Sequence, residues 1–255
     1  MTDLHKRVAI VLFPGSNCEV ETARAVEAAG MRSSIVRWNE RLDPPFDAYI
    51  LPGGWSYEDR VRAGAVAAHD SVMRVIRDEA DLGKPVLGIC NGAQILAEAG
   101  MVPGSSADPR VALAPNERGY RCAWVRLRLV AVPARTDFTC AFEPGEIVEI
   151  PIAHGEGRFV TRDAESDWLM RVAVFQYCDS AGNPASHYPD NPNGSVHALA
   201  AISNEAGNVV AMMPHPERAS WWRQHPPGIK ERASKTSYPP AQKIFESLRR
   251  SIMRE

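Results

Sequence analysis

The strongest chemical signal in the sequence lies at Cys90, between the apolar stretch 85–89 and a segment with helical character. Gly88 and Gly92 flank it in the pattern Gly-Ile-Cys-Asn-Gly, the cysteine version of a turn that presents a nucleophile between a strand and a helix. Side chains at the two glycine positions would clash in so sharp a turn. A sulfur at a helix N-terminus meets unpaired N–H groups and the helix dipole, which favour the thiolate. The alternative is that Cys90 is a small buried apolar residue, as most free cysteines are.

A histidine and a glutamate far downstream supply what a cysteine nucleophile needs. His215 and Glu217 follow the apolar stretch 209–213, with one proline between them. Two residues apart in an extended chain they project to the same side, so Glu217 can orient an imidazole that exchanges protons with the thiol. A His near a Glu means little alone. Together with Cys90 the pair favours nucleophilic catalysis, because parallel sheets gather active sites at the ends of their strands.

Backbone N–H groups near Cys90 are candidates for holding the oxyanion that a thiolate creates when it attacks a carbonyl. Asn91 follows the nucleophile directly and offers one N–H. Gly53 and Gly54 end another apolar stretch, and a glycine pair can turn its N–H groups toward a crevice. The alternative for this pair, and the simpler interpretation of it alone, is a plain tight turn.

The first hundred residues alternate between strand and helix patterns. Nearly continuous apolar runs are typical of strands buried on both faces of a parallel sheet. The patterns predict strands over 7–13, 33–38, 47–55 and 84–89, and helices over 18–30, 63–82 and 91–99. This alternation predicts βαβ units with right-handed crossovers.

The second half is richer in strand patterns and more often interrupted. Strands are predicted over 120–130, 145–159 and 171–178, followed by a loop over 179–195 and two strands within 197–213. We therefore expect a single α/β domain over residues 1–255, with a mostly parallel central sheet flanked by helices and additional β strands in the second half. Residues of about 219–240 are expected to form a surface extension before a C-terminal helix over about 241–250.

Composition narrows the class of protein. The net charge of −2 with interspersed signs predicts neither nucleic-acid binding nor attraction to anionic lipid. No apolar run reaches the roughly 20 residues that span a bilayer. The five cysteines are widely spaced without a Cys-x-x-Cys pair, and the histidines lack metal-ligand spacing. These features predict a cytoplasmic protein without a disulfide framework and without a metal site.

The motifs together resemble a known family. The stretches Pro-Gly-Gly at 52–54, Gly-Ile-Cys-Asn-Gly-Ala-Gln at 88–94 and Pro-His-Pro-Glu at 214–217 resemble the class I, triad-type glutamine amidotransferases. More narrowly, the stretches FPGSNCEVET, PIAHGEGRF, NPNGS and MMPHPER are similar to those of the glutaminase subunits of phosphoribosylformylglycinamidine synthase. The likeness runs over about residues 8–218 and implies a flavodoxin-like fold.

The resemblance also implies a reaction. Cys90 would attack the side-chain carboxamide of L-glutamine, and His215, oriented by Glu217, would protonate the departing ammonia and later activate water. N–H groups of Asn91 and of Gly53 or Gly54 would hold the oxyanion. Gln94, one helical turn after Cys90, matches the family position that helps hold the backbone end of the substrate. Residues 154–159 would lie near the site or the partner interface.

The partners and cofactors follow from the same resemblance. Ammonia would pass to a synthetase subunit, with or without a small third subunit, which uses ATP and Mg²⁺ to aminate formylglycinamide ribonucleotide in purine biosynthesis. This chain itself would need no cofactor, and it carries no Gly-x₄-Gly-Lys-Ser/Thr phosphate loop. The alternatives are another glutaminase of this class or a γ-glutamyl hydrolase built on the same turn, and a non-catalytic scaffold, which an intact triad disfavours.

Two positions depart from the family pattern. Ala93 stands where the family usually carries a larger residue, and Glu58 stands where a glycine is usual. Neither departure removes a reactive group from the predicted triad, but Glu58 leaves the conformation of its loop open.

Overall fold

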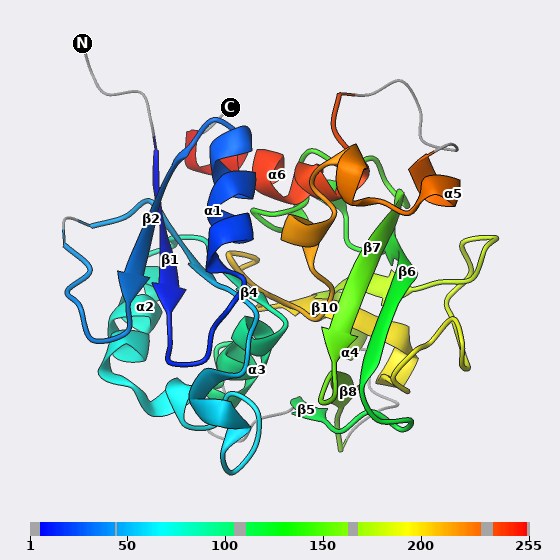
Figure 1. The fold of residues 1–255 in the computed structure, drawn as a ribbon, viewed down its shortest axis with the longest axis horizontal. Coiled ribbons are helices and arrows are strands. Elements are labelled where there is room, and N and C mark those ends of the chain that lie inside the picture. Colours follow the sequence, from blue (N-terminus) through cyan, green and yellow to red (C-terminus); the bar gives the residue numbers. More distant parts are fainter. Residues whose placement is uncertain (1–5, 44, 105–110, 163–167, 231–236, 254–255) are drawn as a thin grey trace.

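The computed structural model describes residues 6–43, 45–104, 111–162, 168–230 and 237–253. Their strands form a nine-stranded sheet in the order β2-β1-β3-β4-β11-β10-β9-β6-β7, with helices packed around it (Figure 1). Because β11 comes late in the sequence but lies beside β4, the sheet brings the two candidate catalytic segments together.

One half of the sheet is parallel. It contains β2 (Arg32–Arg37), β1 (Arg7–Leu12), β3 (Ala48–Leu51), β4 (Val86–Ile89) and β11 (Val209–Met212). Every residue of β3, β4 and β11 is buried, as expected for strands covered on both faces. The carboxyl ends of these strands therefore open onto one shared edge.

The other half is antiparallel. It contains β10 (Leu199–Ser203), β9 (Ala173–Tyr177), β6 (Arg121–Leu129) and β7 (Ile147–His154), which lies at the edge of the sheet, on the right in Figure 1. A separate pair, β5 (Ala112–Ala114) and β8 (Arg158–Val160), forms a small second sheet. The predicted α/β class, with additional strands in the second half of the chain, is confirmed.

Among the described residues, three predicted helices begin and end close to their predicted limits, one starts later than predicted, and two short helices were not predicted. The helices are α1 (Glu19–Ala28), α2 (Ser71–Asp81), α3 (Asn91–Glu98), the short α4 (Trp168–Val172) and α5 (Pro227–Lys230), and α6 (Lys243–Met253). The helix predicted over 63–82 is wrong in its first part, because α2 starts only after Asp70. Gly64 has a φ of +78°, and a Cβ there would lie 2.7 Å from the backbone of Gln94. At Gly64 the chain therefore packs closely against α3 in a left-handed backbone conformation, and the helix does not extend back to residue 63.

The C-terminal segment packs back onto the N-terminal half. Helix α6 lies beside α1 near the top of Figure 1, and the Gln242 side-chain amide donates to the carbonyl of Ala25 at 2.9 Å. Within the segment predicted as a surface extension, Ala219 and Ser220 are fully buried. Across the described ranges, no helix combines the length and apolarity needed to cross a membrane.

Candidate active site

Cys90 lies at the turn between β4 and α3 and adopts a strained backbone conformation. Its φ of 51° and ψ of −105° are unusual for a residue with a side chain and cost about 1–3 kcal/mol. Gly88 and Gly92 make this turn possible: a Cβ at Gly88 would lie 2.5 Å from the carbonyl oxygen of Gly92, and one at Gly92 would overlap the carbonyl of Leu51. The steric prediction for both glycines is confirmed.

The turn places the sulfur at the N-terminal end of α3. Cys90 is 5% exposed, and its sulfur lies 3.6 Å from the carbonyl oxygen of Ala153. Its own N–H donates to the carbonyl of Met212 at 2.8 Å, which ties the end of β4 to the end of β11. Met212 precedes His215 by three residues, so this bond holds Cys90 close to the segment that carries His215.

His215 and Glu217 form a buried pair just after β11. His215 directly precedes the short 3₁₀ turn η5 (Pro216–Arg218), and Glu217 lies within it. The Nδ1 atom of His215 lies 2.6 Å from Oε1 of Glu217, and the two side chains are 2% and 0% exposed. Burial alone would lower the pKa of His215, but the Glu217 carboxylate and Cys90 raise it well above its usual value. The pair therefore favours an imidazolium beside Cys90.

The second nitrogen of His215 remains available for proton transfer. Its Nε2 atom is buried and has no hydrogen-bond partner among the described residues. Because Nδ1 is committed to Glu217, Nε2 is the atom that can exchange a proton with the Cys90 thiol or with a bound substrate. The tertiary structure thus brings Cys90, His215 and Glu217 together, as the sequence predicted.

The glycine pair after β3 lies against the same edge. The carbonyl of Gly53 accepts hydrogen bonds from the N–H groups of Asn17 and Cys18 at 3.1 and 3.3 Å. Because a trans peptide directs its N–H opposite to its carbonyl, the N–H of Gly54 points away from those residues. A Cβ at Gly53 would lie 2.8 Å from Cε1 of His215, so glycine is needed for the imidazole to pack there.

Asn91 and Gln94 form part of a hydrogen-bond network beneath the site. The Asn91 side chain accepts from the N–H of Ser56 at 3.0 Å and donates to Oε1 of Gln94 at 2.9 Å. Gln94 in turn donates to the carbonyl of Glu156 at 2.6 Å. Both side chains are buried, and the backbone N–H of Asn91 lies in the first turn of α3, where helix N–H groups lack intrahelical partners. Gln94 therefore holds the loop after β7 against α3.

The glycine-bearing loop after β7 lies against the turn at Cys90, which is the first of its two predicted locations, the site or the partner interface. His154 is 3% exposed, and burial, with a smaller effect from His215, lowers its pKa to about 3, so that it is neutral. Asn116 donates to the carbonyl of His154 at 2.8 Å and accepts from the N–H of Gly157 at 2.9 Å. Only glycine fits at position 157, because a Cβ there would overlap the His154 ring.

Two residues near the catalytic pair were not predicted to be part of the site. Cys18, expected only to start the first helix, packs beside His215, and Arg218 donates to its sulfur at 3.0 Å. Cys18, His215 and Glu217 present ligand-type atoms within 4.8 Å of one another. The Arg218 guanidinium at this sulfur opposes a cation there electrostatically. No local sequence signal marks this contact, because it depends on the parallel pairing of β1 with β3 in the folded sheet.

The loop after the glycine pair has an unusual backbone. Tyr57, Glu58 and Asp59 have φ angles of 52°, 58° and 52°, all in the left-handed region. Glu58 thus occupies a conformation that suits glycine, and it is exposed and pairs with Arg60 at 2.9 Å. The Asp59 carboxyl is partly buried, which, together with the nearby Glu156, raises its pKa to about 6.

We expect Glu58→Gly to relieve this strain. A left-handed residue with a side chain costs about 1–2 kcal/mol relative to glycine, so Glu58→Gly should exceed Glu58→Ala in unfolding free energy by about 1 kcal/mol. Urea denaturation of both variants measures the difference, and the alanine variant controls for loss of the exposed ion pair with Arg60. Equal stability of the two variants would show that the loop relaxes out of the left-handed region.

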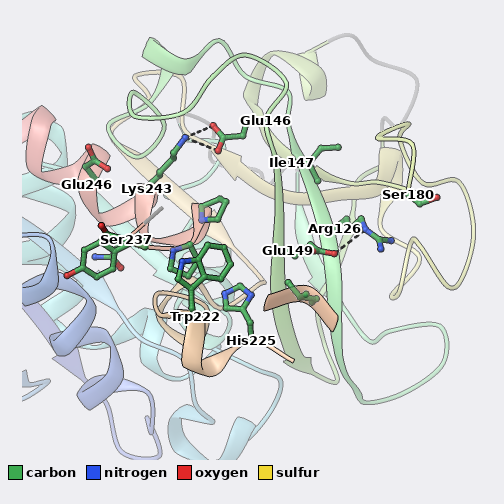
Figure 2. Close-up of a pocket in the computed structure, with 15 residues that line it drawn as sticks. Arg126, Glu146, Ile147, Glu149, Ser180, Trp222, His225, Ser237, Lys243 and Glu246 are labelled. Atoms are coloured by element: carbon green, nitrogen blue, oxygen red, sulfur yellow. Dashed lines mark hydrogen bonds and ion pairs between the residues drawn. The ribbon is translucent and has the colours of Figure 1, made fainter. Parts of the chain in front are cut away.

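A separate pocket of about 640 Å³ lies between β6, β7 and the C-terminal segment (Figure 2). Trp222 and His225 contribute rings to its wall, and Lys243 pairs with Glu146 at 2.8 Å along its rim. The lining residues do not include Cys90, His215 or Glu217. The described part of 219–240 therefore helps to build a cavity apart from the candidate site.

Comparisons with known proteins agree with this geometry. A model of the CobB/CobQ-like glutamine amidotransferase domain matches residues 5–251. The chain is 45% identical to the phosphoribosylformylglycinamidine synthase subunit PurQ of Methanothrix thermoacetophila, over 96% of this chain and 98% of that protein. It is 46% identical to the PurQ subunit of Pyrococcus furiosus, over 84% of this chain and 89% of that protein.

A solved structure gives the same result in three dimensions. A chain in the structure of PurLQS from Thermotoga maritima superposes with a TM-score of 0.74 at 36% identity, covering 96% of this chain and 97% of that chain. The agreement extends over the parallel and antiparallel halves of the sheet alike, because nearly the whole of each chain is matched. With its glycine-flanked cysteine turn and buried His–Glu pair at one sheet edge, this chain belongs to the PurQ family of glutamine amidotransferases.

Proposed function

We propose that the chain hydrolyses L-glutamine to glutamate and ammonia as the glutaminase subunit of a phosphoribosylformylglycinamidine synthase. The ammonia would serve a synthetase subunit that converts formylglycinamide ribonucleotide to formylglycinamidine ribonucleotide in purine biosynthesis. The observation that carries the proposal is the convergence of Cys90 with the buried His215–Glu217 pair, in a chain that aligns with PurQ subunits over nearly its whole length.

The first half-reaction forms a thioester. The Cys90 thiolate attacks Cδ of the glutamine carboxamide, and the C=O electron pair moves to oxygen to give a tetrahedral oxyanion. When the C–N bond breaks, the imidazolium of His215 gives its proton to the nitrogen, and ammonia leaves. Glu217 stabilises the imidazolium and fixes the ring orientation, because its carboxylate is 2.6 Å from Nδ1.

The second half-reaction releases glutamate. Neutral His215 takes a proton from a water molecule whose oxygen attacks the thioester carbonyl. The C–S bond then breaks, so that glutamate leaves and the thiolate–imidazolium pair is restored. In both steps the N–H of Asn91 and the N–H of Gly53 or Gly54 would stabilise the oxyanion. Gln94 would contribute to holding the backbone end of the substrate.

The wider assignment follows from the family. The synthetase, with or without a small third subunit, would hold the ATP and Mg²⁺, and this chain would act without a metal or other cofactor of its own. The proposed location is the cytoplasm. Neither nucleic acid nor a membrane is proposed as a partner.

The test is glutamate release by the purified chain, alone and with its cognate synthetase, ATP, Mg²⁺ and formylglycinamide ribonucleotide. We expect slow release by the chain alone, acceleration by the synthetase, and one formylglycinamidine ribonucleotide formed per glutamate. Preferential cleavage of γ-glutamyl peptides over free glutamine would favour a γ-glutamyl hydrolase instead. Absence of glutamate release from free glutamine in the full mixture would contradict the proposed glutaminase function.

A further inference from the structure

The sulfur of Cys18 lies next to the catalytic pair, on a different element from either partner. Cys18 directly precedes α1 and is 1% exposed. Its sulfur, a ring nitrogen of His215 and a carboxylate oxygen of Glu217 all lie within 4.8 Å of one another. The parallel strands β1, β3, β4 and β11 end at the same edge of the sheet. The turn after β1, which carries Cys18, therefore lies at the edge where η5 follows β11.

Arg218 connects this thiol to α1. Its Nη2 donates to the Cys18 sulfur at 3.0 Å, and its Nε lies 3.5 Å from Oε1 of Glu21 and 3.9 Å from Oε1 of Glu217. The guanidinium therefore spans the first turn of α1 and the catalytic turn. Removing the sulfur would leave one of its donors without this partner at a half-buried position.

Cys18 also limits where the imidazole can lie. The backbone of Gly53 is close to both side chains: a Cβ at Gly53 would lie 3.0 Å from the Cys18 sulfur and 2.8 Å from Cε1 of His215. The N–H of Cys18 donates to the Gly53 carbonyl at 3.3 Å. Cys18, Gly53 and Glu217 thus form three sides of the space that holds the ring edge carrying Nδ1 and Cε1.

The thiol is suited to a supporting role and not to nucleophilic attack. Burial raises the pKa of Cys18, and the nearby Glu217 carboxylate acts in the same direction, whereas His215 and Arg218 oppose this rise. The sulfur therefore stays protonated and donates to Oδ1 of Asn17 at 3.2 Å. Because the Cys18 thiol is neutral, it does not take the proton of the His215 imidazolium, which stays available for the reaction at Cys90.

We propose that Cys18 is a positioning residue for the reaction: its sulfur, held by Arg218, fixes the His215 ring in line with Cys90. This inference rests on the proposed glutaminase function, because it concerns the same histidine. Cys18 does not touch the substrate, and its effect is exerted through the orientation and protonation of His215.

The experiment compares Cys18→Ala, Cys18→Ser and Cys178→Ala in the complex with the synthetase. Cys178 is a matched control, since it is also 1% exposed, and the charged groups that act on its thiol, Asp179, Arg126, Arg128 and Asp190, do not include His215 or Glu217. We expect Cys18→Ala to lower kcat about tenfold with KM changed by less than about twofold, as loss of one buried hydrogen-bond acceptor would do. Cys18→Ser should restore most of kcat, because a hydroxyl still accepts from Arg218.

The pH profile separates positioning from loss of a buried side chain. The groups that face His215 are Cys18 before α1, Cys90 at the start of α3, Glu217 and Arg218 on its own turn, and, farther off, Tyr120 and His154. The interaction with Cys18 raises the pKa of His215. Its removal should lower the pKa of His215 and so move the alkaline limb of kcat/KM to lower pH.

The outcomes are distinguishable. If wild type releases no glutamate, the proposed function fails. If wild type is active while Cys18→Ala matches it in kcat and pH profile, only the positioning role fails. Equal losses of kcat in Cys18→Ala and Cys178→Ala, with unchanged pH limbs, would likewise overturn the positioning role, since the effect would then be general destabilisation.

Discussion

Replacing Cys90 with alanine is expected to lower the rate of glutamate release by about 10⁴-fold or more, because the covalent route is then closed. The backbone at this position is strained with φ of 51°, and alanine keeps the same backbone requirement as cysteine. The fold should therefore persist. Glutamate release measured in the complex with saturating glutamine gives the result directly.

Two further measurements make this prediction specific. Synthesis driven by added ammonium chloride should continue in the Cys90→Ala complex, since the synthetase reaction does not need this thiol. A diazo-ketone analogue of glutamine should label Cys90 in wild type, although Cys90 is buried, and should spare Cys122, although Cys122 is exposed. Normal glutamine turnover by Cys90→Ala would remove Cys90 from the mechanism altogether.

Replacing Glu217 with glutamine is expected to reduce kcat by about 10²–10⁴-fold, the usual contribution of acid–base catalysis. The side chain is fully buried and makes a 2.6 Å contact with Nδ1 of His215. A neutral amide removes the charge that opposes the effect of burial on the histidine, so the pKa of His215 falls. The imidazolium that protonates ammonia is then lost at lower pH.

The sign of the pH effect follows from this change. Activity that requires the imidazolium should disappear as pH rises through the lowered pKa of His215, so the alkaline limb of kcat/KM moves to lower pH. The variant Glu246→Gln is a suitable control, because Glu246 pairs with Arg250 on the surface of α6. An unchanged alkaline limb in Glu217→Gln would mean that Glu217 does not set the protonation of His215.

Local sequence patterns were sufficient to predict several elements of the site. Gly88 and Gly92 are needed for steric reasons, since a Cβ at either position would clash with nearby backbone atoms. The apolar run of β4 and the helical pattern of α3 are likewise local, and they place Cys90 at a strand-to-helix turn. Pro214 and Pro216 stiffen the segment that carries His215 and Glu217, which explains why their direct contact was predictable.

Other features depended on contacts between distant segments. The start of α2 was mispredicted because Gly64 meets the backbone of α3, a contact that the periodicity of 63–82 does not contain. The left-handed run at Tyr57, Glu58 and Asp59 also runs against the preference of those residue types. In both cases packing overrides local propensity.

The sequence by itself indicated the candidate reactive groups, the α/β class and the turn that carries Cys90, because these depend on residue types and short-range sterics. Only the tertiary structure decided that β11 pairs with β4 and that the turn after β1 brings Cys18 to the catalytic histidine. The order of strands in a sheet depends on how all strands and helices bury their apolar faces together. The pairing of two strands that are distant in sequence therefore has no local sequence pattern. For that reason Cys90, His215 and Glu217 could be singled out from the sequence, whereas the packing of Cys18 and Arg218 beside His215 could not.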